Sequence, residues 1–183
     1  MKKGILNNRG VVNRLKFTLV LLFPCALPLA LGGCGESGYT NESLFPANVS
    51  TVCLKMFDNK TFRRGVEYEL SDALAKRIET ETPYKIVSDQ DIADTVIEGQ
   101  IVSIGEHALS TDRELGSVLE KEVEVTAVIQ WKNLKTGELL IDHKTVAASA
   151  SYSDYQLQDF KYGSTVAANN LARKIVELME RSW

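Results

Sequence analysis

The sequence predicts an α+β fold, a two-layer sandwich in which two helices pack on one face of a mixed sheet of four to five strands. Two stretches, residues 66–80 and 159–181, repeat apolar residues at helical spacing, and each predicts an amphipathic helix. Further stretches have the composition of strands, which gives the order β-α-β-β-β-β-α. The clearest of them, residues 122–131, alternates apolar and polar residues, as expected of a sheet with one buried face.

The first half of the predicted domain is a strand, a helix and a second strand. Residues 51–57 are rich in β-branched and apolar side chains and predict a strand. The helix over residues 66–80 ends before Pro83, and residues 84–87 predict a short strand. If these two strands are parallel, the helix should connect them by a right-handed crossover.

The second half is predicted to hold three longer strands and the last helix. Residues 95–104 are apolar on much of both faces, which predicts a strand. Residues 122–131 and 139–147 flank the turn sequence NLKTG at 133–137, whose last residue is a glycine that is free to take a positive φ. These two strands should form an antiparallel hairpin, and residues 149–158 should follow as a polar and aromatic loop.

The N-terminus has the pattern of a bacterial lipoprotein signal peptide. A basic leader without acidic residues precedes the apolar run 17–31, and the sequence LGGC then ends at Cys34. As a helix this run would span only about 22 Å of a hydrocarbon core of about 30 Å, and Pro24 and Pro28 interrupt it. We therefore expect cleavage before Cys34 and a lipid on its sulfur, rather than a transmembrane helix.

These features divide the chain into three predicted parts. Residues 1–33 are a signal peptide that is removed, residues 34–48 are a flexible tether rich in Gly, Ser and Asn, and residues 49–183 are one domain. In lipoproteins of this type an Asp after the lipidated cysteine favours the inner membrane. Gly35 stands there in this chain, which favours the outer membrane.

The predicted mature chain is acidic. The leader carries five basic residues, so taking these from the 21 Lys and Arg leaves 16, against 24 Asp and Glu. The resulting net charge of about −8 argues against nucleic acid as a partner. Cys53 is the cysteine that remains besides Cys34, so we expect no intramolecular disulfide and interpret Cys53 as a small buried hydrophobe.

The sequence contains no convincing catalytic or metal-binding constellation. The two histidines, His107 and His143, are far apart, and no Cys/His cluster has zinc spacing. The chain also lacks a glycine-rich phosphate loop and a nucleophile elbow. We interpret His143 as a structural residue on the inner face or near the edge of the sheet. The expectation is a protein that is not an enzyme and uses no cofactor or metal.

A basic cluster is the one concentrated feature of this acidic domain. It surrounds the end of the first predicted strand and the start of the first helix, and consists of Lys55, Lys60, Arg63 and Arg64. Together with the helix N-terminus, these cations would suit the phosphate groups of a lipid headgroup. The alternative is solvated loop charge, partly balanced by Glu67 and Glu69. We name the four cations as candidate ligand-binding residues.

Several short motifs together resemble one known family. They are Gly33-Cys34-Gly35, MFDNKTF at 56–62, GVEYEL at 65–70, ADTVIEGQI at 93–101 and TGELL at 136–140. The strand motif A-D-x-x-(I/L/V)-x-G-x-(I/V) and the hairpin motif T-G-E-x-(L/V) resemble those of the lipopolysaccharide-assembly lipoprotein family LptE, in its divergent, non-enteric form. One departure is Lys55, which stands where such members often carry proline.

The resemblance implies an outer-membrane lipoprotein on the periplasmic face, anchored in the membrane by its N-terminal lipid. It also implies an LptD-like β-barrel partner, whose lumen the lipoprotein plugs, and a role in delivering lipopolysaccharide to the outer leaflet. Two other classes share parts of these motifs: a curli-type secretion component and a lipoprotein activator of a cell-wall synthase. The 150 residues from Cys34 onward leave little room for membrane-spanning strands, and a tether of about 15 residues reaches at most ~50 Å. Both points favour the LptE assignment.

Overall fold

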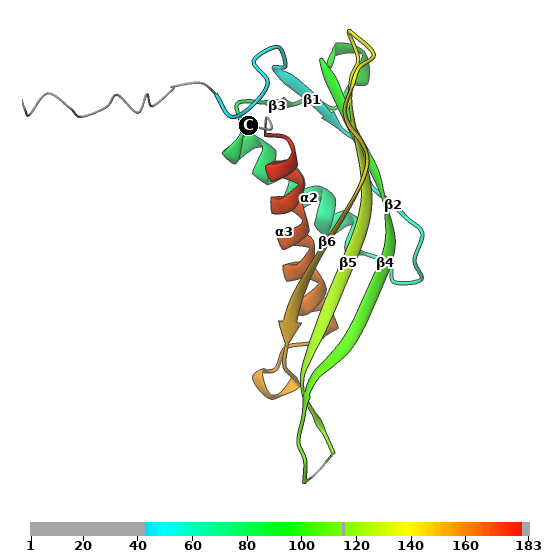
Figure 1. Ribbon diagram of the computed structural model, residues 1–183, viewed down its shortest axis with the longest axis vertical. Coiled ribbons are helices and arrows are strands. Elements are labelled where there is room, and N and C mark those ends of the chain that lie inside the picture. Colours follow the sequence, from blue (N-terminus) through cyan, green and yellow to red (C-terminus); the bar gives the residue numbers. More distant parts are fainter. Residues whose placement is uncertain (1–42, 115, 181–183) are drawn as a thin grey trace, which may run out of the picture. The chain divides into compact units, whose positions relative to one another are not determined.

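Two helices and a six-stranded sheet make up the part of the chain that the computed structural model describes, residues 43–114 and 116–180. The chain divides into two units, Met1–Glu42 and Ser43–Trp183, and all described residues belong to the second. Within that unit the helices lie along one face of the sheet (Figure 1). The predicted α+β class, with both helices on one face of a mixed sheet, is confirmed.

The strands run in the order β3-β1-β4-β5-β6, and β2 pairs with β4 beyond the end of β1. Their bounds are Thr51–Leu54 for β1, Asp58–Asn59 for β2, Lys85–Ile86 for β3, Thr95–Thr111 for β4, Val118–Asn133 for β5 and Leu139–Tyr152 for β6. The helices are α2 (Val66–Glu81) and α3 (Phe160–Leu178), and short 3-10 turns occupy η2 (Gln90–Ile92) and η3 (Asp154–Gln156). Strand β1 is parallel to β3 and β4, and β2 is parallel to β4, whereas the β4–β5 and β5–β6 pairs are antiparallel.

The core lies between the sheet and the two helices, as the alternation in residues 122–131 predicted. The apolar residues of β5 that face the helices are all at most 2% exposed: Val123, Val125, Ala127, Ile129 and Trp131. The buried stripe of α3 contains Ala168, Leu171 and Ile175. Each large apolar side chain buried in this way contributes about 1.5–3 kcal/mol. The packing is close, because a Cβ on Gly163 at the start of α3 would come within 2.7 Å of the Tyr152 ring.

The three long strands extend beyond their predicted bounds. Strands β4 and β5 continue past residues 95–104 and 122–131 into one projecting hairpin, and β6 continues into the predicted loop 149–158. The segment 105–121 carries mixed polar side chains and Gly105 without alternation, so no pattern marked it as strand. Its structure comes from the main-chain ladder between β4 and β5, which depends on pairing rather than on burial.

The predicted tether, 34–48, overlaps the beginning of the described unit. Phe45 is 7% exposed, and its ring packs edge-on against Tyr84 with the ring centroids 5.8 Å apart. Cys34 and the predicted signal peptide lie outside the described residues. The predicted boundary of the domain at residue 49 and the removal of residues 1–33 stay predictions.

Among the residues that the structure describes, no α-helix covers the opposite face of the sheet. At one end, a small second cluster of Cys53, Ala93 and Val96 is covered by Val87 and Leu134. Cys53 is 5% exposed and forms no disulfide, so the prediction of a buried small hydrophobe is confirmed. Away from this cluster the face is open, and it carries the groove described next.

Candidate functional site

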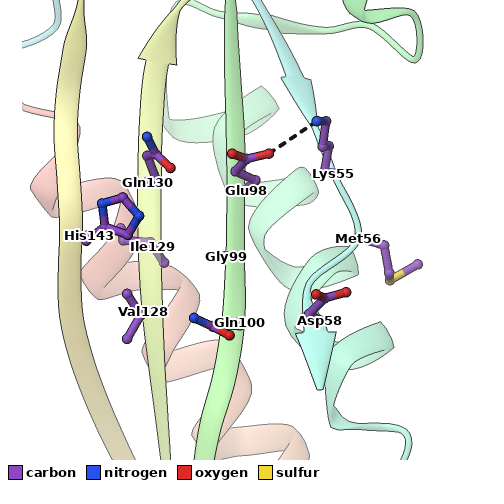
Figure 2. A pocket seen from close by; sticks show the side chains of 10 residues that line it. All are labelled: Lys55, Met56, Asp58, Glu98, Gly99, Gln100, Val128, Ile129, Gln130 and His143. Atoms are coloured by element: carbon purple, nitrogen blue, oxygen red, sulfur yellow. Dashed lines mark hydrogen bonds and ion pairs between the residues drawn. The ribbon is translucent and has the colours of Figure 1, made fainter. Parts of the chain in front are cut away.

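A groove of about 370 Å³ lies on the helix-free face, where the chain passes from β1 to β2 beside β4 (Figure 2). Polar side chains from β4, β5 and β6 line it, among them Glu98, Gln100, Gln130 and His143. Lys55 lies at one end, with its Nζ 3.2 Å from Glu98 Oε2. The helices lie behind the strands in Figure 2, so the groove opens to solvent on the side away from the helices.

Two glutamine side chains in this groove have no hydrogen-bond partner within the part of the chain that the structure describes. They are diagonal neighbours on adjacent strands, since Gln130 pairs with Glu98 and Gln100 pairs with Val128. Each side-chain amide offers two donors and one acceptor oxygen. Sequence reasoning did not name them, although the alternation in residues 95–104 would have put Gln100 beside Glu98 on one face.

His143 lies at the groove because β6 bulges at this point. The register between β5 and β6 shifts around Gln130, so that two residues of β6, Asp142 and His143, stand opposite one residue of β5. The φ of His143 is 39°, a left-handed value that costs a residue other than glycine about 1–2 kcal/mol. Its Nδ1 lies 2.6 Å from Asp142 Oδ1. Of the two predicted places for His143, the sheet edge is right and the inner face is wrong, because the bulge turns this exposed residue away from the core.

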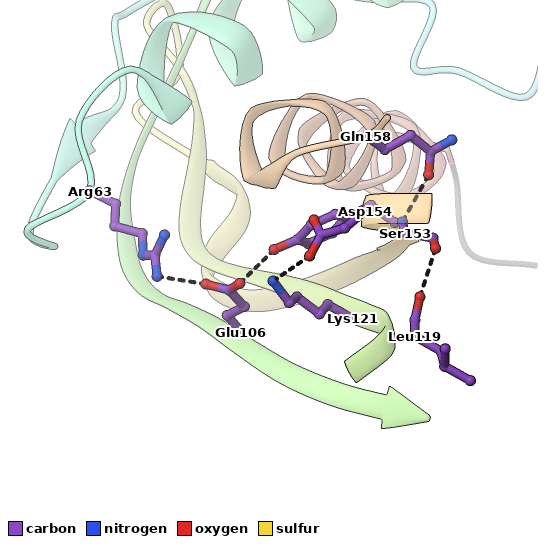
Figure 3. Close-up of polar contacts among 8 residues, drawn as sticks. Arg63, Glu106, Leu119, Lys121, Ser153, Asp154 and Gln158 are labelled. Atoms are coloured by element: carbon purple, nitrogen blue, oxygen red, sulfur yellow. Dashed lines mark hydrogen bonds and ion pairs between the residues drawn. The ribbon is translucent and has the colours of Figure 1, made fainter. Parts of the chain in front are cut away.

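A network of polar contacts joins the base of the projecting hairpin to the start of α3 (Figure 3). The Tyr152 hydroxyl donates to Glu106 Oε1 at 2.5 Å, and Arg63 Nη2 donates to Glu106 Oε2 at 2.8 Å. The Arg63 guanidinium also stacks over the Phe160 ring, 3.9 Å from its centroid. Beside them, Lys121 pairs with Asp154 at 3.1 Å. Glu106 was not predicted, because it lies in the segment that had no strand pattern.

This network shifts the ionisation of both oxygen acids. The hydrogen bond from Tyr152 and the Arg63 guanidinium outweigh partial burial and lower the pKa of the Glu106 carboxyl. Burial and the hydrogen bond to Glu106 raise the pKa of Tyr152 to about 12. At neutral pH Glu106 is therefore an anion that binds the Arg63 guanidinium and the neutral Tyr152 hydroxyl. The Arg63 charge is thus already paired within the protein.

The candidate cations fall into two places. Lys55 lies at the groove with Glu98, whereas Lys60, Arg63 and Arg64 lie in the loop between β2 and α2. In that loop Lys60 Nζ lies 3.4 Å from Asp58 Oδ2, and Arg64 Nη1 donates to the Asn59 carbonyl at 3.1 Å. Lys60 and Arg64 are both exposed. Their role in binding phosphate stays a prediction.

The N-terminus of α2 already holds an anion of the chain itself. Glu67 Oε2 accepts from the backbone N–H of Gly65 at 2.9 Å and from Asn59 Nδ2 at 2.6 Å. Burial opposes ionisation of Glu67, but these hydrogen bonds outweigh it and lower the pKa of its carboxyl. An external phosphate at this helix end would therefore meet a carboxylate as well as Arg64.

Asp94 of the A-D motif and Lys135, which directly precedes the T-G-E motif in the 133–137 turn, connect two distant segments. Asp94 Oδ2 accepts from the backbone N–H groups of Ser50 and Thr51 at 2.8 and 2.9 Å, and Asp94 Oδ1 lies 2.5 Å from Lys135 Nζ. Asn133 Oδ1 accepts from the backbone N–H groups of Lys135 and Thr136, and Gly137 has φ 76° as predicted. The A-D and T-G-E motifs are therefore structural: they fix the start of β1 against the β5–β6 hairpin.

Two further features of the described ranges, 43–114 and 116–180, bear on the site. No group of three or more His, Cys, Asp and Glu residues in them is placed to hold a metal ion. No helix in them is long and apolar enough to cross a bilayer. Cys34, the predicted lipidation site, lies outside these ranges.

Two solved structures share the fold at low sequence identity. The hypothetical protein CT253 from Chlamydia trachomatis has a TM-score of 0.51 at 11% identity, over 70% of this chain and 94% of that chain. The uncharacterized lipoprotein B from Nitrosomonas europaea has a TM-score of 0.51 at 15% identity, over 76% of this chain and 88% of that chain. No curated protein sequence matches the chain. At these identities the two structures show the fold alone.

A family model gives the more specific assignment. The model described as LptE, lipopolysaccharide-assembly, matches residues 49–182. This match spans every strand of the sheet and both helices, and it includes the A-D and T-G-E motifs that join β1 to the β5–β6 hairpin. The chain therefore belongs to the LptE family, a lipoprotein family of lipopolysaccharide assembly.

Proposed function

We propose that this protein is an outer-membrane lipoprotein, anchored by a lipid on Cys34, that binds and plugs a β-barrel of the LptD type on its periplasmic side. In that position it assists the insertion of lipopolysaccharide into the outer leaflet. The observation that carries the proposal is the family match over residues 49–182. The LGGC sequence before residue 35 supports the lipid anchor.

The chemistry of the surface agrees with this role. A domain that fills a hydrated barrel needs polar side chains on the faces that meet the lumen, and the helix-free face carries such residues, including Glu98, Gln100 and Gln130. The projecting β4–β5 hairpin offers an extended element for contact with a wall of strands. A carrier or plug acts by binding, and the groove offers no serine or cysteine nucleophile to its histidine.

The lipid anchor is tested by intact-mass analysis of protein extracted from membranes. We expect a chain that begins at Cys34 and carries added acyl mass, and a Cys34→Ser variant that stays uncleaved or is released in soluble form. A membrane-extracted chain with an unmodified Cys34 would contradict the anchor. Fractionation of inner and outer membranes on a density gradient then decides the outer-membrane location.

Barrel binding is tested by affinity purification of the tagged, lipidated protein from its own host. We expect one outer-membrane β-barrel to co-purify, and we expect depletion of the protein to lower the level of assembled barrel and to raise sensitivity to hydrophobic toxins. A tagged unrelated lipoprotein of the same membrane is the control. Recovery of a cell-wall synthase or a secretion channel, with normal barrel assembly after depletion, would instead identify one of the two other lipoprotein classes.

A further inference from the structure

The groove on the helix-free face presents hydrogen-bonding groups that the protein itself does not use. Gln100 and Gln130 are half-buried, and their amides have no partner among residues 43–114 and 116–180. Met56 and Val128 supply the apolar part of the lining. The volume of about 370 Å³ lies at the lower end of the range typical of small-molecule sites.

His143 supplies a third polar group to the groove, and it does so from a β-bulge that the pairing of β5 with β6 does not require. A glycine would suit the positive φ at this bulge better than histidine does. Bulges re-aim side chains beside binding sites, and strained backbone persists where a side chain has a use. Because the Asp142 carboxylate can only accept, Nδ1 of His143 donates to it and Nε2 is left for a ligand. The chain therefore holds an imidazole beside Gln130.

The charges around the groove nearly cancel. Lys55 pairs with Glu98 and Lys60 pairs with Asp58, so the site has no excess of cations for a phosphate. The residues in the groove are also not placed to share a metal ion, since no such cluster occurs in the described ranges. A neutral ligand with many hydroxyl groups matches better, because each hydroxyl both donates and accepts, as two amides and an imidazole require.

We propose that this groove binds the sugar rings of a saccharide through Gln100, Gln130 and His143. The proposal does not depend on binding to a barrel. Two sources supply this chemistry at a bacterial periplasmic surface, namely the sugar portion of lipopolysaccharide and the glycan strand of peptidoglycan. The test separates these two sources.

The experiment is an NMR titration of residues 43–183, the unit that contains the whole core described above. One probe is a neutral, phosphate-free hexose oligosaccharide from the outer core of lipopolysaccharide, and the other is the peptidoglycan disaccharide of N-acetylglucosamine and N-acetylmuramic acid with its carboxyl group as the methyl ester. We expect saturable shifts of the Gln100 and Gln130 side-chain amides and of the His143 backbone amide with one of the probes. The probe that binds identifies the source, and the absence of saturable shifts at the groove with both would overturn the proposal.

Variants distinguish a binding role from a structural one. The double variant Gln100→Ala/Gln130→Ala should weaken binding at least tenfold, while Gln90→Ala, an exposed glutamine on η2, should leave it unchanged. His143→Gly should weaken binding at least fivefold while the melting temperature stays equal or rises, because glycine relieves the positive φ. Unchanged affinity in His143→Gly and in the double variant, with both proteins folded, would also overturn the proposal.

Discussion

Asp94 and Thr51 exchange two hydrogen bonds across parallel strands. The backbone N–H of Thr51 donates to Asp94 Oδ2 at 2.9 Å, and the backbone N–H of Asp94 donates to Thr51 Oγ1 at 2.9 Å. Lys135 from the β5–β6 turn completes the junction with its ammonium group 2.5 Å from Asp94 Oδ1. One carboxylate thus ties together the beginnings of β1 and β4 and a turn about forty residues later along the chain.

Replacing Asp94 should therefore lower the stability of the domain. Asp94→Ala leaves the backbone N–H groups of Ser50 and Thr51 without their acceptor, which costs about 1–3 kcal/mol of the free energy of unfolding. Urea denaturation of the domain at pH 7 measures this loss. Lys135→Ala is the matched control and should cost less than 1 kcal/mol, because its side chain is 72% exposed. An equal loss in both variants would place the effect in the ion pair instead.

The same carboxyl gives a prediction for acid. The hydrogen bonds from Lys135, Ser50 and Thr51 hold the pKa of Asp94 well below its usual range. Its contribution to stability is therefore complete above the pKa of Asp in the unfolded chain, about 4, and is lost as the pH falls from there toward the lowered value. We expect the stability difference between the native chain and Asp94→Asn to shrink below pH 4. A difference that is constant from pH 7 to pH 2 would contradict this assignment.

The raised pKa of Tyr152 predicts that the stability of the domain falls at alkaline pH. Its pKa is raised to about 12, so the neutral hydroxyl stabilises the fold below the pKa of about 10 that tyrosine has when unfolded, and this contribution is lost as the pH rises through 12. Tyr152→Phe should cost about 1–2 kcal/mol at pH 7, since it leaves Glu106 with one partner fewer. It should also remove the part of the alkaline loss that begins near pH 10. Thermal unfolding between pH 7 and 11 measures both effects.

Gly99 is predicted to be intolerant of any side chain. A Cβ at this position would lie 2.6 Å from Phe57 Cε1 and 2.7 Å from the Val128 carbonyl oxygen, and the carbonyl belongs to the paired backbone of β5. Gly99→Ala should therefore lower the free energy of unfolding by about 1–3 kcal/mol, as overpacking does. Gly105→Ala, on the same strand, is the control, because the atoms nearest to its Cβ belong to the exposed His107 ring rather than to backbone. Equal stability of the two variants would contradict the close packing at Gly99.

How well the sequence predicts an element depends on which interaction stabilises that element. Helix α2 and the apolar face of β5 were predicted from periodicity, because burial against the helices enforces it. The outer parts of β4 and β5 carry no periodic pattern, since neither face of the projecting hairpin is buried. Main-chain pairing defines them, together with the contacts of Glu106 and Lys121 at the base of the hairpin. The turn at Gly137 was predictable because its residues demand a specific backbone.

The candidate site shows the same division. The cations could be identified from the sequence, but their partners could not, because a partner can be distant along the chain. Arg63, for example, pairs with Glu106, which lies 43 residues later. The sequence did not indicate the bulge at His143 either. A positive φ at a bulge is usually indicated by a glycine, and this position is a histidine. Gln100 was within reach of an alternation argument, but nothing in the sequence marked its amide as lacking a partner.

The last prediction concerns phosphate binding by the loop between β2 and α2. Arg63 is committed to Glu106 and Phe160, so Arg63→Glu would place two carboxylates together and should destabilise the domain. Lys60 and Arg64 are exposed and free of such packing, so they give the cleaner test. If the loop holds lipopolysaccharide phosphates, Lys60→Glu/Arg64→Glu should weaken lipopolysaccharide binding at least tenfold in a folded protein, and native binding should fall with salt. The measurement is a pull-down on immobilised lipopolysaccharide at two salt concentrations, with Lys132→Glu/Lys161→Glu, two exposed lysines on β5 and α3, as the charge-matched control. Equal binding by Lys60→Glu/Arg64→Glu and by the control would show that the cations of this loop are solvated and bind no phosphate. The anion at the N-terminus of α2 is then Glu67 of the chain itself.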